Sequence, residues 1–164
     1  MYPTNSNEEG MKRSMTFKIE TLPKYRVAYM RQVGPYGPAN SQVMENLKGW
    51  AKKKNLFKSA IIFGIPQDNP AITLSENCRY DACIVISMDY PLEDSVYEGE
   101  LSGGEYATFQ VKHTAEDIQK AWAEIFPALH NSGYQIDNKP ILERYTDELV
   151  KSHYCEICVP VKPL

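Results

Sequence analysis

The sequence lacks the features of several specialised classes of protein. Its 164 residues contain no apolar run that approaches the roughly 18 residues of a membrane span. The N-terminal stretch MYPTNSNEEGMKRSM has no apolar core, so it is no signal peptide, and we expect a cytoplasmic protein that makes no membrane contact. A phosphate-binding loop is also missing, because the glycine pair Gly103-Gly104 precedes an expected strand and not a helix.

Charge and cysteine content exclude further functions. A net charge of −3 argues against a protein that binds nucleic acid directly. The sequence has one C-x-x-C pair, Cys155 and Cys158, with no second pair or histidine-rich segment after it. Residues 153–161 are β-prone, and side chains three apart on a strand point to opposite faces. We therefore expect structural thiols, no metal site and no cofactor.

Tyrosine is the residue type present in excess, with 11 tyrosines beside 5 phenylalanines and 2 tryptophans. The apolar fraction of 43% and the charged fraction of 24% are those of a globular protein, and the length suffices for one core. Residues 1–15 are polar and unpatterned, which predicts a disordered tail. We expect residues 16–164 to form a single domain.

That domain contains two units of the same kind. The first unit, about residues 16–90, has a strand, a Gly/Pro-rich turn, a helix and two strands, expected at 25–33, 34–38, 43–55, 60–65 and 79–88. The second unit, about residues 97–162, has a strand, a helix and two strands, expected at 105–112, 114–133, 140–145 and 154–161. Thr114 suits the start of the second helix, Pro127 should kink it and Gly133 suits its end.

This repeat predicts an α+β fold. We expect duplicated β-α-β-β units related by a pseudo-twofold axis, with antiparallel sheets and two main helices that form a central ligand cleft. Aligning the last strands of the units places Tyr154 on Tyr80 and Glu156 on Ala82.

Glu156 breaks the pattern of the last strand. Both faces of this strand are otherwise apolar or weakly polar, which is typical of a central strand covered on both sides. A carboxylate there loses hydration, which raises its pKa and makes it a candidate general acid or base. The alternatives are an edge strand that exposes Glu156 to water, or a structural ion pair.

Aromatic residues are further candidates. Trp122 lies on the apolar stripe of the second helix and could belong to the core or to a site. Tyr36, inside the Gly/Pro turn, is either an exposed anchor or a lid over the cleft. Tyr145 precedes a polar turn and could place its ring at the mouth of the cleft, with Phe63 as a neighbouring ring.

Several short motifs in this order resemble the GyrI-like small-molecule-binding family. The matching stretches are Val33-Gly34-Pro35-Tyr36, Arg79-Tyr80-Asp81, Ala121-Trp122, and the segments 101–107 and 156–161. The family includes the bacterial DNA gyrase inhibitory protein and the effector-binding domains of multidrug-responsive transcription regulators. The resemblance covers about residues 16–162.

The resemblance implies a cleft that binds hydrophobic aromatic xenobiotics, with Glu156 at its centre. One standalone subfamily hydrolyses the cyclopropane ring of DNA-alkylating antibiotics of the yatakemycin and duocarmycin type. Similarity to it implies that Glu156 and Trp122 are catalytic and that Tyr36, Phe63 and Tyr145 bind the ligand. Two alternatives remain open: a non-catalytic binder that sequesters toxins, and a gyrase inhibitor that acts by protein–protein contact.

Overall fold

The computed structural model describes residues 15–164, so the tail expected at residues 1–15 lies outside the described residues except for Met15. The strands are β1 (Lys18–Leu22), β2 (Tyr25–Val33), β3 (Ile62–Pro66), β4 (Arg79–Ile86), β5 (Tyr97–Leu101), β6 (Gly104–Lys112), β7 (Tyr134–Ile136), β8 (Leu142–Tyr145) and β9 (Tyr154–Pro163). The helices are α2 (Pro38–Lys53), the 3-10 helix η1 (Ser75–Asn77), α3 (Ala115–Asn131) and α4 (Asp147–Lys151). No helix in this part of the chain is long and apolar enough to cross a membrane.

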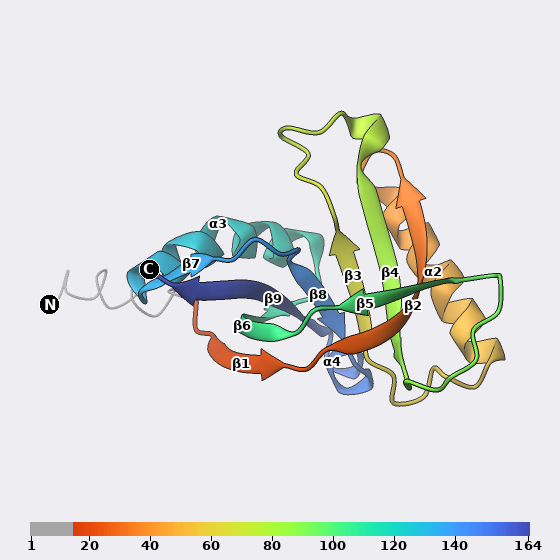
Figure 1. Ribbon diagram of the computed structural model, residues 1–164. Helices are drawn as coiled ribbons and strands as arrows, with labels where there is room; N and C mark the ends of the chain where they lie inside the picture. Colours follow the sequence, from red (N-terminus) through yellow and green to blue (C-terminus); the bar gives the residue numbers. More distant parts are fainter. Residues whose placement is uncertain (1–14) are drawn as a thin grey trace, which may run out of the picture.

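One curled antiparallel sheet connects both halves of the described chain (Figure 1). Its strand order is β1-β6-β9-β8-β3-β4-β2-β5, and β7 pairs in addition with β9. Outward from the centre, the order is β3-β4-β2-β5 on one side and β8-β9-β6-β1 on the other. The predicted α+β fold with duplicated units is therefore confirmed, and the units share one sheet whose pseudo-twofold axis passes between β3 and β8.

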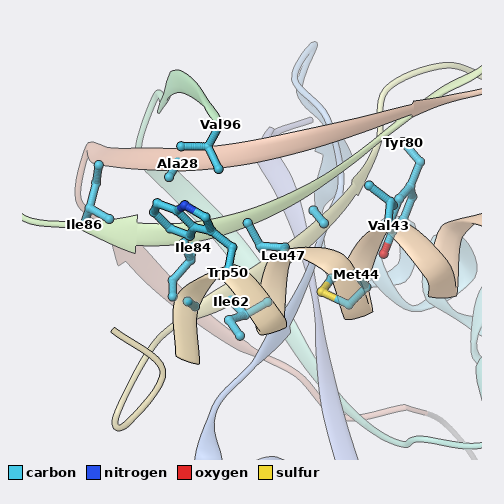
Figure 2. Packing of buried hydrophobic residues seen from close by; sticks show 12 residues of the cluster. Ala28, Val43, Met44, Leu47, Trp50, Ile62, Tyr80, Ile84, Ile86 and Val96 are labelled. Carbon is cyan, nitrogen blue, oxygen red and sulfur yellow. The ribbon is translucent and has the colours of Figure 1, made fainter. Parts of the chain in front are cut away.

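Helix α2 covers one face of the first half of the sheet. Proline is well tolerated in a first helical turn, where its missing N–H has no partner to lose, and α2 begins at Pro38. The buried side chains of α2 recur at helical spacing, and Leu47 and Trp50 pack in one cluster with Ala28 and Ile84 of the sheet (Figure 2). Burial of each large apolar side chain here stabilises the fold by about 2 kcal/mol.

Helix α3 covers the same face of the second half. The Thr114 side chain accepts a hydrogen bond from the backbone N–H of Asp117, which confirms the predicted start. Pro127, at which the sequence predicts a kink, lies inside the helix, which continues to Asn131. Gly133 follows with a φ of +87°, and its N–H donates to the carbonyl of His130, so it terminates the helix as predicted.

The opposite face of the sheet has a core of its own. Its buried residues come from strands of both halves and include Leu22, Val27, Phe63, Tyr106 and Cys158. The sheet is curled here (Figure 1), and the buried side chains of these strands pack together on this face. Because neighbouring residues of a strand alternate between the two faces, the face on which a residue lies decides whether it can reach the side of the helices.

Candidate functional site

A cavity of about 950 Å³ lies between α2 and α3, over the strands at the centre of the sheet. Helix α2 contributes residues 40, 41, 44, 45 and 48, which share one face of the helix. Helix α3 contributes an apolar wall of three residues spaced four apart: Ile118, Trp122 and Phe126. The segment 66–70 after β3 borders another side. The predicted cleft between two helices is therefore present.

The floor of this cavity carries an ionisable group, the carboxyl of Glu143 on β8. The hydroxyls of Tyr80 on β4 and Tyr145 on β8 both donate hydrogen bonds to it. Burial raises the pKa of Glu143 to about 7, although the two hydrogen bonds act in the opposite direction. Burial also raises the pKa of both tyrosines, so their hydroxyls keep their protons and remain donors.

Gly64 on β3 makes room for this arrangement. It lies opposite Glu143 in the β3–β8 pair. A Cβ atom on Gly64 would overlap the hydroxyl oxygen of Tyr80 and would lie 3.0 Å from Oε1 of Glu143. A residue without a side chain at this position therefore allows the tyrosine to reach the carboxyl across the sheet.

The structure brings three of the five predicted site residues to the cavity: Trp122, Tyr145 and Tyr36. Tyr36 has a structural task there, because its hydroxyl donates to the carbonyl of Arg79 at 2.7 Å and accepts from the N–H of Asp68 at 3.1 Å. These bonds tie the turn before α2 to both ends of the β3–β4 connection. Tyr36 is thus fixed at the rim of the cavity by hydrogen bonds. This position differs from both expected alternatives, an exposed anchor and a lid over the cleft.

Phe63 does not line the cavity. Its side chain is 0% exposed and belongs to the core on the face away from the helices. There its ring centroid lies 5.8 Å from that of Tyr25. The expected position of Phe63 among the rings of the cleft is wrong, because neighbouring strand residues alternate between faces and Ile62, not Phe63, points to α2.

Glu156 also lies outside the cavity. Arg144 donates from Nε to Oε1 of Glu156 at 2.9 Å and from Nη2 to Oε1 of Glu20 at 2.6 Å. Arg144 points away from the helices, since its neighbours Glu143 and Tyr145 point toward the cavity. The expected position of Glu156 at the centre of the cleft is therefore wrong. The alternative of a structural ion pair is the one that the structure shows.

A shift of one residue in the repeat alignment explains the misplacement of Glu156. The strand residues that pack with the helices are Ile84 in the first half and Val159 in the second, whereas Cys158 belongs to the opposite core. Glu156 is thus equivalent to Asp81, not to Ala82. A one-residue shift in a strand exchanges the two faces.

The corrected alignment places an ion-paired carboxylate at the same position of both halves. Asp81 accepts two hydrogen bonds from Arg31, from Nε at 2.7 Å and from Nη2 at 2.9 Å. Glu156, the equivalent carboxylate of the second half, pairs with Arg144 of β8, whereas Arg31 belongs to β2, so the two arginines come from strands that are not equivalent. The same alignment makes Glu143 the counterpart of Gly64. The sequence pattern does not single out Glu143 as a site residue, because a four-residue strand is too short to define its faces.

The described residues contain no group of three or more His, Cys, Asp or Glu side chains that could hold a metal ion. The four cysteines are free and buried. Cys158 belongs to the core away from the helices, while burial raises the pKa of Cys155 to about 12. The thiols of Cys155 and Cys158 are therefore protonated near neutral pH, since burial raises the pKa of both.

A curled sheet that carries two helices, with a cavity between them and an ionisable group at its floor, defines a class of α+β proteins that bind small molecules. The comparison with family models agrees with this description. The chain belongs to the GyrI-like family: the model of the GyrI-like small molecule binding domain matches residues 15–162.

Two relatives match over nearly their whole length. The chain is 40% identical over 149 residues to the "SPbeta prophage-derived putative transcriptional regulator YosT" of Bacillus subtilis (strain 168), covering 90% of this chain and 100% of that protein. It is 29% identical over 154 residues to a DNA gyrase inhibitor of Salmonella arizonae, covering 90% of this chain and 99% of that protein.

Two solved structures share the fold. The EcmrR C-terminal domain superposes with a TM-score of 0.71 at 16% identity, covering 92% of this chain and 99% of that chain. A hydrolase encoded by lin2189 from Listeria innocua superposes with a TM-score of 0.62 at 10% identity, covering 96% of this chain and 98% of that chain. At these identities the likeness concerns the fold alone.

Proposed function

We propose that this protein binds flat, hydrophobic aromatic compounds that carry a cationic or electron-poor atom, and that it hydrolyses cyclopropane-bearing DNA-alkylating antibiotics of the yatakemycin and duocarmycin type. The single observation that carries the proposal is the carboxyl of Glu143 on the floor of the cavity, held by two tyrosine hydroxyls and facing the aromatic wall of α3. The side chain of Trp122 offers a face on which a flat ring can stack.

Glu143 suits the role of general base. With a pKa of about 7, a large fraction of the carboxyl is ionised near neutral pH and can take a proton from water. Carboxylates of ordinary pKa are weaker bases and are more fully hydrated. The two tyrosine hydroxyls fix the orientation of the carboxyl, so its free lone pairs point to the cavity.

In the reaction that we propose, the oxygen of water forms a bond to the cyclopropane CH₂ while Glu143 takes a proton from that water. The C–C bond of the three-membered ring breaks, and its electron pair moves through the conjugated ring to the carbonyl oxygen, which becomes a phenolate. The phenolate then takes up a proton, so one water has been added in total. The π-face of Trp122 stabilises the positive charge that develops at the attacked carbon.

Mass spectrometry of a cyclopropane-bearing alkylator incubated with the purified protein tests this proposal. We expect a product heavier by one water, and we expect Glu143→Gln and Trp122→Ala to lower its rate of formation by about a hundredfold or more. Glu156→Gln is the matched control, because this carboxyl lies on the other face of the sheet. An unchanged rate in Glu143→Gln, or an equal loss in Glu156→Gln, would contradict the role of Glu143.

A binder that sequesters toxic compounds without converting them is the second candidate function. The apolar cavity alone supports it, with ionised Glu143 as the counter-ion of a bound cation. Stoichiometric binding without the ring-opened product would favour this function over hydrolysis. Calorimetry of the same compounds would then measure the affinity.

A third candidate, inhibition of DNA gyrase by protein–protein contact, follows from relatives that are named DNA gyrase inhibitor. Purified gyrase that supercoils DNA equally well with and without this protein would contradict this candidate function.

We propose small molecules, and not nucleic acid, as direct ligands of this protein, because its net charge is −3. We also propose the cytoplasm as its location, where the four buried cysteines stay reduced.

A further inference from the structure

Lys48 and His113 are a second pair of polar residues that line the cavity, on the side of the C-terminal part of α2. Lys48 is the last residue of α2 that lines the cavity, and it lies seven positions after Ser41. Seven residues of helix span about 10 Å, so Lys48 lies well away from the rim at Asp68 and Tyr36. His113, in the turn between β6 and α3, lines the same cavity, close enough to Lys48 for the charge of the ammonium to act on its imidazole.

His113 is close to Glu143 through one shared neighbour. The imidazole ring lies 5.2 Å from the ring of Tyr145, centroid to centroid, at an interplanar angle of 58°. The hydroxyl of Tyr145 donates in turn to Glu143. Tyr145 therefore contacts both the imidazole and the carboxyl, so a single six-membered ring with its substituent is long enough to span between them.

The polar atoms of this pair are available to a ligand. No hydrogen bond to the ring nitrogens of His113 is present among residues 15–164, where burial and the charge of Lys48 are the influences on the imidazole. Burial lowers the pKa of His113, and the charge of Lys48 lowers it further, so the neutral imidazole offers one N–H donor. Lys48 Nζ lies 3.7 Å from Oε2 of Glu45, whose side chain is 69% exposed, a loose contact at the surface.

Other charged residues around the cavity are engaged elsewhere. Asp68 binds Arg79 through both carboxylate oxygens, at 2.9 Å from Nε and 2.8 Å from Nη2. Lys139 donates to the carbonyl of Gly103 at 2.8 Å. Among the described residues that line the cavity, the charged groups mainly available to a ligand are therefore the carboxyl of Glu143 and the ammonium of Lys48.

We propose that Lys48 and His113 form a second subsite, which binds an acceptor oxygen of the ligand, a carbonyl or carboxylate, about one six-membered ring away from the atom that contacts Glu143. The inference rests on the proposed function and narrows its ligand class. A ligand of this class is a flat aromatic compound with a cationic or electrophilic atom at one end of a ring and an acceptor oxygen at the other.

The arrangement also bears on the proposed hydrolysis. In a cyclohexadienone that carries a spiro-cyclopropane opposite its carbonyl, the electron pair of the breaking C–C bond ends on an oxygen one ring away. Lys48 and His113 would then donate to this oxygen as its negative charge develops, while Glu143 takes the proton of the attacking water. Preorganised donors at a developing oxyanion lower the barrier of such a step.

Two matched probes test the subsite in the intact protein: 10-methylacridinium, and 10-methylacridinium that carries a carboxylate at position 9, across the central ring from the charged nitrogen. Fluorescence titration gives the ratio of their two dissociation constants. We expect Lys48→Met to raise the dissociation constant of the carboxylate probe by about tenfold relative to that of 10-methylacridinium. For His113→Phe, which keeps an aromatic ring against Tyr145, we expect a relative increase of about threefold. Lys53→Met, an exposed lysine of α2, is the control and should leave the ratio unchanged.

The possible outcomes separate this inference from the function on which it rests. If wild type binds the probes but Lys48→Met leaves the ratio unchanged, or weakens both probes equally, the subsite is overturned and the binding function stands. If wild type binds neither probe, both the subsite and the proposed binding of flat cations fall. Thermal unfolding of each variant verifies that a changed ratio comes from folded protein.

Discussion

Glu143 and Gly64 face each other across the β3–β8 pair, at the point where the two halves of the sheet meet. By the corrected alignment they are also equivalent positions of the two units. One half thus supplies an ionisable group to the cavity floor and the other supplies empty space. Departure from symmetry at the pseudo-twofold axis gives the floor of the cavity a single carboxyl, with Tyr80 reaching it over Gly64.

The first prediction concerns the stability of the fold between pH 4.5 and 7. The pKa of Glu143 rises from 4.5 to about 7 on folding, so in this range the folded state binds a proton that the unfolded state has released. The free energy of unfolding therefore falls as pH rises through this window, by about 3 kcal/mol from this group. Urea unfolding of wild type and Glu143→Gln at several pH values measures it.

Glu143→Gln should lack this contribution, because an amide does not titrate. Subtracting its profile from that of wild type isolates the group, and the difference should level off below pH 4.5. A difference between the two profiles that does not vary with pH would show that the carboxyl has an ordinary pKa in the folded protein.

The second prediction concerns Gly64→Ala. The new methyl group must displace the Tyr80 hydroxyl, and because Tyr80 is buried under α2 its ring has little room to move. We expect a loss of about 1–3 kcal/mol in the free energy of unfolding. The pKa of Glu143 should rise above 7, because the Tyr80 hydrogen bond stabilises the ionised carboxyl.

Infrared spectroscopy of the carboxyl band across a pH titration measures this pKa directly. Gly49→Ala is the control, since a Cβ atom at Gly49 meets nothing within 4 Å. If Gly64→Ala shifted neither the band nor the stability, Gly64 would not be needed to admit the tyrosine.

The fold of this protein could be predicted from sequence because its main elements have long, regular patterns. Strand β2 alternates over nine residues, and Thr114 and Gly133 bound α3 at the expected places. The edge strands β1 and β5 were not anticipated, because each is short and mostly polar and is formed by pairing with β6 and β2. Such pairing depends on segments distant in the sequence.

The site was predicted in part for a related reason. Trp122 lies on the apolar stripe of a long helix and Tyr145 directly precedes a polar turn, and both reach the cavity. Glu156 and Phe63 were assigned to the wrong face, since the alternation of a strand fixes two faces without saying which one meets the helices. A signal for Glu143 was present in retrospect: a carboxylate between Leu142 and Tyr145 in a strand at the centre of the sheet must be paired or functional.

A third prediction concerns the anchoring of the β3–β4 connection by Tyr36. Tyr36→Phe removes the hydroxyl that bonds both Asp68 and Arg79, and leaves an N–H and a carbonyl without that partner. We expect the free energy of unfolding to fall by about 1 kcal/mol. Amide hydrogen exchange in residues 66–79 should become faster, with little change in α3.

Tyr97→Phe provides the matched control for this measurement, because Tyr97 is 63% exposed on the edge strand β5. It should leave both the stability and the exchange rates as they are in wild type. Equal exchange in Tyr36→Phe and wild type would mean that the loop is held by the Asp68–Arg79 pair alone.

The last prediction separates the structural carboxylates from that of the cavity. Arg144 lies between Glu20 and Glu156, and its removal in Arg144→Met leaves two carboxylates near each other without their cation. Removing one partner of a buried pair costs about 3 kcal/mol, most of it from the charge left behind. We therefore expect a large drop in the urea midpoint of Arg144→Met, and a partial recovery when Glu156→Leu is added, because one unpaired charge is then gone. Ligand affinity of the double variant should stay close to that of wild type. A double variant less stable than Arg144→Met, or one that no longer binds ligand, would show that Glu156 does more than neutralise Arg144.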